Sequence, residues 1–171
     1  MRSTPTIVEL ALLLVWLGGA LLFAAVVAPA LFATLPTRTL AGAVVGRVLP
    51  AIFYSGILVG LATVVLDWQA RGEWIWRGGA TGGLLILASC AVAQFVISPR
   101  IERVRRSIAG PIESLTPDDP RRAAFGKLHA VSVAWLGIAM LCAAIVAVAA
   151  ARSLHLAIAE ERSAVPGIGD L

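Results

Sequence analysis

Four long apolar runs limit the folds open to this chain more than any other feature of its sequence. They lie at about residues 7–32, 44–66, 78–97 and 129–151. A helix needs roughly 20 mostly apolar residues to cross the hydrocarbon core of a bilayer, and each run is about that long. Strands of a membrane barrel would instead alternate apolar and polar residues. The sequence therefore predicts an all-α integral membrane protein, a four-transmembrane-helix bundle.

Charged residues are too few for a fold that water surrounds on all sides. Of the 171 residues, 14% are charged and 59% are hydrophobic, whereas soluble domains carry about 25% charged residues. Lipid must therefore cover part of the surface, and the lipid bilayer is the first predicted partner. The net charge of +4 comes from arginines between the apolar runs. This pattern favours loop charges that set membrane topology over a nucleic-acid partner.

The distribution of basic residues predicts the orientation. The first and third connections together hold nine Lys and Arg residues, and the opposite side of the membrane holds five. Because basic connections stay in the cytoplasm, we expect both termini outside, in a bacterial inner membrane. We divide the chain into a transmembrane domain at 1–159 and a flexible tail at 160–171, because the tail contains Pro166, Gly167 and Gly169.

The third connection, residues 98–128, is the only sizeable polar region. Apolar residues recur in it at spacings of three and four, with arginines between them. This amphipathic pattern either lies along anionic lipid headgroups or continues the third helix into the cytoplasm. Further along, Asp119 is expected to cap the fourth helix, with Pro120 at its first position.

Small residues recur four positions apart in the second and third runs. The pairs are Gly56 with Gly60 and Gly79 with Gly83. Lipid is as apolar as the helices, so helices associate in a membrane through close packing at small residues. We expect these glycines to mark helix packing within the bundle or contacts with a partner, either a second copy of the chain or another membrane protein.

Polar residues at membrane depth are costly, and they suggest a functional site. Gln94 lies near the inner end of the third run, and His129 and Ser132 share one face at the start of the fourth. We expect these three side chains to form a polar intramembrane cluster. A hydrogen-bonded packing site is favoured over a cofactor or proton-relay site. Glu9, near the outer end of the first run, is expected to reach the interface.

The sequence holds no recognisable catalytic motif or metal-ligand spacing. Cys90 and Cys142 lie in separate runs, and His155 belongs to the opposite membrane face from His129. Haem or copper would need more ligands than these. We therefore predict no catalytic residues, no metal site and no cofactor, with haem kept as the alternative.

Two stretches resemble a known family. One has Trp-Leu-Gly-Gly at residues 16–19 followed by Pro-Ala-Leu-Phe at 29–32, and the other has Phe-x-x-Leu-His-x-x-Ser at 125–132. Both resemble the transmembrane protein 205-like family (domain of unknown function 4149), over about residues 10–150. The resemblance implies a four-helix membrane protein with no assigned reaction. It also implies signature positions of unknown role, namely Trp16, Gly18, Gly19, Pro29, Phe32, Leu128, His129 and Ser132.

The Trp-x-Gly-Gly stretch also resembles membrane haem and copper-resistance proteins. Those proteins carry a histidine about two turns before the tryptophan, whereas this chain has Glu9 there. We therefore favour a non-enzymatic membrane subunit of a structural, accessory or assembly type. The alternatives are a haem- or metal-linked membrane oxidoreductase that uses His129 and a small dimeric transporter.

Overall fold

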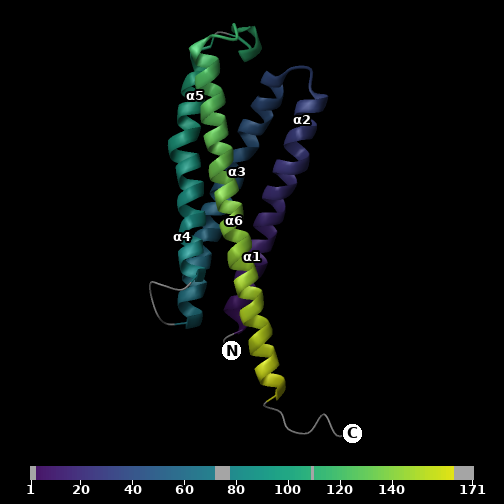
Figure 1. Ribbon diagram of the computed structural model, residues 1–171, viewed down its shortest axis with the longest axis vertical. Coiled ribbons are helices and arrows are strands. Elements are labelled where there is room, and N and C mark those ends of the chain that lie inside the picture. Colours follow the sequence, from purple (N-terminus) through teal and green to yellow (C-terminus); the bar gives the residue numbers. More distant parts are fainter. Residues whose placement is uncertain (1–2, 72–77, 109, 164–171) are drawn as a thin grey trace.

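The computed structural model describes residues 3–71, 78–108 and 110–163, and these residues form four helical rods without strands (Figure 1). All four rods are long and apolar enough to cross a membrane, which confirms the predicted fold class. The first rod joins α1, a π-helical turn η1 and α2, and the third joins α4, a second π-helical turn η2 and α5. The elements are α1 Ser3–Leu22, η1 Phe23–Val27, α2 Ala28–Thr34, α3 Arg38–Arg71, α4 Gly78–Ala91, η2 Val92–Ile97, α5 Ser98–Arg106, the 3-10 turn η3 Ile112–Ser114 and α6 Pro120–Ser163.

Two helices are much longer than the apolar runs within them. α3 has 34 residues and α6 has 44, which correspond to lengths of about 51 and 66 Å. Since the hydrocarbon core is about 30 Å thick, both helices project beyond it. α6 also continues through residues 160–163, the first part of the segment expected to be a flexible tail. They follow good helix formers and include three more, so the helix continues. Residues 164–171 lie outside the described residues.

The bundle is closed at one end and open at the other. Near the termini, α1 packs against α3 and α6, and α4 packs against the same two helices. Toward the other end, α2 packs against α3 while α5 packs against α6, and Figure 1 shows these two pairs separating. We call this second end, which carries the connections 35–37 and 107–119, the arginine-rich end. The end that carries both termini is the terminal end.

The backbones of α3 and α4 approach each other closely at two glycines. A Cβ atom on Gly60 would lie 2.7 Å from the carbonyl oxygen of Gly83, and a Cβ atom on Gly83 would lie 2.8 Å from that of Gly60. One turn earlier in α3, a Cβ atom on Gly56 would lie 2.8 Å from the ring of Trp16. No larger residue fits at these positions without a shift of the helices. Such close approach gives the dispersion contacts that hold membrane helices together.

Trp16 anchors the core of the closed half. Its indole Nε1–H donates a hydrogen bond to the carbonyl oxygen of Ile52, at 3.1 Å, and its side chain is buried. This bond ties α1 to α3 and satisfies the polar atom of a large buried ring. The other buried side chains of this core come from all four rods and include Leu13, Phe53, Ile86, Cys90, Ala93, Leu136, Ala139, Ala143, Val146 and Ala147.

Two acidic side chains are buried toward the terminal end. Asp67 accepts a hydrogen bond from the N–H of Ala80 at 3.0 Å, and it thereby satisfies a backbone donor in the first turn of α4. Glu9 is only 3% exposed, so its side chain is buried within the bundle. It shares the buried face of α1 with Leu13 and Trp16, four and seven residues further on, and this face turns it into the bundle.

Prolines follow the two π-helical turns, which lie at the level where the two pairs of helices separate. η1 ends two residues before Pro29, and η2 ends two residues before Pro99. Proline has no N–H to donate, and a π-helical turn is one way in which a helix accommodates a local change in its hydrogen bonds. α3 carries Pro50 in its interior, also in the half toward the arginine-rich end. Helices bend at such positions, which agrees with their separation there.

Candidate binding cavity at the arginine-rich end

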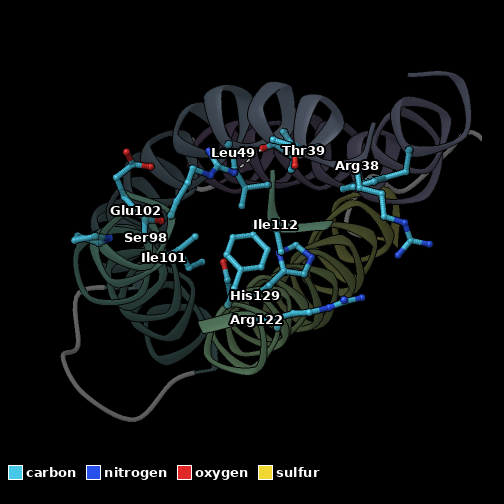
Figure 2. A pocket seen from close by; sticks show the side chains of 18 of the residues that line it. Arg38, Thr39, Leu49, Ser98, Ile101, Glu102, Ile112, Arg122 and His129 are labelled. Carbon is cyan, nitrogen blue, oxygen red and sulfur yellow. Dashed lines mark hydrogen bonds between the residues drawn. The ribbon is translucent and has the colours of Figure 1, made fainter. Parts of the chain in front are cut away.

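A cavity of about 710 Å³ lies between the separated helices at the arginine-rich end (Figure 2). Ligand pockets for small molecules have volumes of about 300–1,000 Å³. Most of the wall comes from α3, α5 and α6. The lining residues are Phe32, Arg38, Thr39, Gly42, Val45, Gly46, Leu49, Pro50, Gln94, Ser98, Pro99, Ile101, Glu102, Arg105, Gly110, Ile112, Glu113, Arg122, Phe125, Gly126, His129 and Ser132.

Three arginines line the cavity, and they differ in their partners. Arg105 donates a hydrogen bond to the carbonyl oxygen of Gly42 at 3.2 Å, which links α5 to α3. Among the described residues, no carboxylate lies within salt-bridge distance of Arg38 or Arg122. Within the described ranges, the one hydrogen bond of the Arg122 side chain is a long one of 3.4 Å to the carbonyl oxygen of Leu115. Two guanidinium groups therefore remain available for an anion.

The two carboxylates of the cavity wall are already engaged. Glu102 pairs with Arg106 at 3.0 Å. Glu113 accepts hydrogen bonds from the backbone N–H of Thr39 at 2.9 Å and from its hydroxyl at 2.5 Å. These bonds, led by the one from the hydroxyl, lower the pKa of the Glu113 carboxyl. They also hold η3 across the end of the bundle, from α5 and α6 to the start of α3.

The third connection shows both features that the sequence indicated. α5 continues the third rod as a helix to Arg106, one of the two arrangements expected for the amphipathic segment. α6 begins at Pro120, and Asp119 accepts a hydrogen bond from the N–H of Arg121 at 2.8 Å, as predicted for its cap. Hydrogen bonds from Arg121 lower the pKa of the Asp119 carboxyl. The α5 wall of the cavity therefore ends near Arg106, and the α6 wall begins at a capped helix start.

The predicted polar cluster lies at the inner end of this cavity. Gln94, His129 and Ser132 all line it, but no hydrogen bond joins any two of them in the described part of the chain. Gln94 donates from Nε2 to the hydroxyl of Tyr54 at 3.4 Å. Its Oε1 atom and the Ser132 hydroxyl are buried without a partner among the described residues. The structure thus brings the three together around a space rather than in a packed contact.

His129 faces the cavity and not the packed core. Its ring stacks on Phe125, one turn earlier in α6, with ring centroids 6.4 Å apart and planes at 1°. Figure 2 shows the imidazole near the centre of the cavity. His155 lies 26 residues further along α6, about 39 Å away along the helix, and it lines a separate apolar pocket. The two histidines cannot share a haem or a metal ion.

Metal ligands do not gather elsewhere in the described residues, which contain no group of three or more His, Cys, Asp or Glu side chains placed to hold a metal ion. Cys90 is buried in the core beside Gly56, and Cys142 is half-buried on α6. Glu9, which stands where the membrane haem proteins with a similar Trp-x-Gly-Gly stretch carry histidine, is buried toward the terminal end.

Comparison with known families assigns the chain to a group. The model of a domain of unknown function, DUF4149, matches residues 11–109. The chain belongs to this family. No curated protein and no solved structure shows significant similarity to it. The DUF4149 match covers α1 to α5, and hence the α2, α3 and α5 walls of the cavity, but it ends before the α6 wall.

The signature positions of this DUF4149 member do not gather at one site. Phe32, His129 and Ser132 line the cavity, whereas Trp16 lies in the closed core. Gly18 and Gly19 are exposed, and a Cβ atom on either would meet no other atom within 4 Å. Pro29 follows η1, and Leu128 is half-buried on α6.

Sequence reasoning missed the basic side of the site. Arg38 and Arg122 were read only as charges that set topology, although both line the cavity. The signal that could have found them is that both lie within seven residues of the start of an apolar run, so that their side chains can reach a site at that end of the bundle. The pairing of Glu113 with Thr39, which are 74 residues apart, had no local signal and needed the tertiary structure.

Proposed function

We propose that this protein is a non-catalytic membrane protein of the accessory type that binds an amphiphilic anion at its arginine-rich end. One observation supports this proposal above the others. A single cavity has an apolar wall that includes Phe32, Val45 and Leu49. It also holds the guanidinium groups of Arg38 and Arg122, which have no carboxylate partner in the described part of the chain. Guanidinium groups favour carboxylate and phosphate ligands, and the apolar wall suits a hydrocarbon portion.

The inner end of the cavity supports a bound ligand as well. A buried hydroxyl or amide oxygen without a partner costs about 1–3 kcal/mol. Ser132 is 1% exposed and lines the cavity, so a ligand or a water that enters can supply its missing hydrogen bond. Binding thus satisfies a polar group that the fold alone leaves unpaired. We also propose that the chain is related to transmembrane protein 205-like proteins. The stretch at residues 125–132 that resembles them forms much of the α6 wall of the cavity.

Purification in mild detergent tests the proposal. Native mass spectrometry should detect a retained anionic amphiphile, and Arg122→Gln should weaken its retention by roughly tenfold, because hydrogen bonds to charged groups contribute about 1.5–3 kcal/mol. Arg103→Gln is the matched control, since Arg103 is an exposed arginine of the same end that does not line the cavity. Equal retention by both variants would contradict an anion site at Arg122.

The same preparation tests the alternatives. An absorbance spectrum with a Soret band would indicate haem on His129 and would favour the oxidoreductase. Release of the bound ligand to the opposite face of a vesicle would favour the small transporter. We place the arginine-rich end in the cytoplasm of a bacterial inner membrane, on the nine-to-five distribution of basic residues between the two sides.

A further inference from the structure

The cavity is bordered on one side by an apolar helix that packs elsewhere. α2 contributes only Phe32 to the lining, and it packs against α3, with no extensive packing against α6 in the described part of the chain. Phe32 at this border is 42% exposed. Figure 2 shows the side chains of Arg38 and Arg122 extending toward one side of the cavity, while Ser98 and Glu102 line the opposite side. The two free guanidinium groups thus flank the side between α2 and α6.

The end of the cavity toward water is crossed by the third connection. Glu113 is bonded to Thr39 at the start of α3, and Ile112 next to it lines the cavity. A ligand that enters along the bundle axis from water must pass this segment. A ligand that enters from the bilayer, between α2 and α6, does not.

The depth of the cavity corresponds to the headgroup layer and the first turn of the hydrocarbon core. The apolar run of α6 begins at His129; Arg122 lies seven residues further out, and Ser132 lies three residues further in. These separations correspond to about 10 Å and about 4.5 Å along the helix. The polar layer on each side of a bilayer is about 5–7 Å thick. We take the guanidinium groups of Arg38 and Arg122 to lie at the outer border of this layer.

We infer that the cavity binds the headgroup and glycerol region of an anionic phospholipid, which enters sideways from the bilayer between α2 and α6. The phosphate oxygens accept hydrogen bonds from Arg38 and Arg122. An ester carbonyl accepts the hydrogen bond that the Ser132 hydroxyl lacks, and the acyl chains pass Phe32 into the bilayer. This inference rests on the proposed function and names its ligand.

The charges of the wall select against a zwitterionic headgroup. An ammonium group needs a carboxylate or another acceptor beside the phosphate site. The lining holds three arginines, Arg38, Arg105 and Arg122, against two carboxylates, and one of these, Glu102, is paired with Arg106. A headgroup with a net negative charge, such as phosphatidylglycerol, therefore fits better than phosphatidylcholine.

Photocrosslinking in nanodiscs tests this inference on the full chain. The probe is phosphatidylglycerol with a diazirine near the ester end of one acyl chain, in a phosphatidylcholine bilayer, and adducts are mapped by peptide mass spectrometry. We expect adducts on the peptides that carry Phe32 and residues 125–132, in excess over lipid-facing Ile145. The double variant Arg38→Gln/Arg122→Gln should give an adduct yield at least tenfold lower than that of the unaltered protein. The control Arg100→Gln/Arg103→Gln removes the same charge at the same end from exposed residues outside the cavity, and it should keep them.

A second arm separates the lipid from other sources of phosphate. Inorganic phosphate and dodecyl phosphate are added from water, and binding is followed by competition with the adducts. If dodecyl phosphate binds through Arg38 and Arg122 but phosphatidylglycerol adducts are equal in both double variants, the phospholipid inference is wrong and the proposed function stands. Full competition by inorganic phosphate alone, or equal labelling by a phosphatidylcholine probe, would also overturn the inference. If neither amphiphile depends on the two arginines, both proposals fail.

Discussion

Ser132 shows how a single side chain can connect stability to binding. Its hydroxyl is buried at the inner end of the cavity with no partner among the described residues. A lone hydroxyl in this position destabilises the empty protein by about 1–3 kcal/mol, whereas one that meets a ligand stabilises the complex. Gln94 presents the same situation through its Oε1 atom, although its Nε2 atom is bonded to Tyr54.

Replacement of Ser132 by alanine should therefore affect the lipid-free and the lipid-bound protein differently. In detergent without lipid, Ser132→Ala should leave the thermal stability unchanged or raise it. With anionic lipid added, the stabilisation by lipid should be smaller than in the unaltered protein. Ser98→Ala is the control, because the Ser98 hydroxyl donates to the carbonyl oxygen of Ala93 at 2.9 Å and its loss should lower stability. Equal losses in the two variants would show that Ser132 has a partner in the empty protein.

Glu113 gives the arginine-rich end a dependence on pH. Hydrogen bonds from Thr39 lower the pKa of this carboxyl from its ordinary value of 4.5. The bonds therefore stabilise the fold above that value and are lost as the pH falls through the lowered pKa. Because the side chain is exposed, the effect is small, below about 1 kcal/mol.

Amide exchange at Thr39, compared between the unaltered protein and Glu113→Gln at each pH, measures this effect. The comparison at equal pH removes the intrinsic dependence of exchange on pH. We expect greater protection in the unaltered protein near neutral pH, and no difference once the pH is well below the lowered pKa of Glu113. A difference that persisted unchanged into acid would mean that the charge of Glu113 is not what holds η3 to α3.

At the scale of elements, glycines and prolines divide the rods into a closed and an open half. Gly60 and Gly83 bring α3 and α4 into backbone contact, whereas Pro29 and Pro99 follow π-helical turns where the helices separate. Apolar runs were enough to predict the four spans, since length and hydropathy determine what crosses a bilayer. They could not predict the π-helical turns, because these depend on local hydrogen bonding that hydropathy does not report.

The glycine contacts predict a contrast between two alanine variants. Gly60→Ala places a methyl group against the backbone of α4 and should lower the thermal stability in detergent. Gly18→Ala meets open space in the single chain, so it should be neutral or stabilise α1 by up to about 1 kcal/mol, the difference in helix propensity. Thermal unfolding followed by circular dichroism measures both. Equal tolerance would show that α3 and α4 are further apart than described. A strong loss at Gly18 would instead place it in a contact between copies.

For the whole molecule, the sequence predicted more of the fold than of the site. Gln94, His129 and Ser132 could be grouped because each lies near the same end of an apolar run, and the structure places all three on one cavity. Arg38 and Arg122 could not be assigned to that cavity, since a basic residue outside a span looks the same whether it sets topology or binds a ligand. The cavity itself follows from the separation of the α2–α3 pair from the α5–α6 pair, which is a property of packing.

The orientation of the molecule in the membrane decides which leaflet supplies the ligand, and labelling of introduced cysteines measures it. Arg103 and Ser163 are exposed at opposite ends of the bundle, and both native cysteines lie within spans. Because nine of the basic residues belong to the side of Arg103 and five to the other, Arg103→Cys should resist an impermeant thiol reagent in intact cells until they are permeabilised. Ser163→Cys should react without permeabilisation. The reverse pattern would place the cavity outside and would make the outer leaflet the source of its phospholipid.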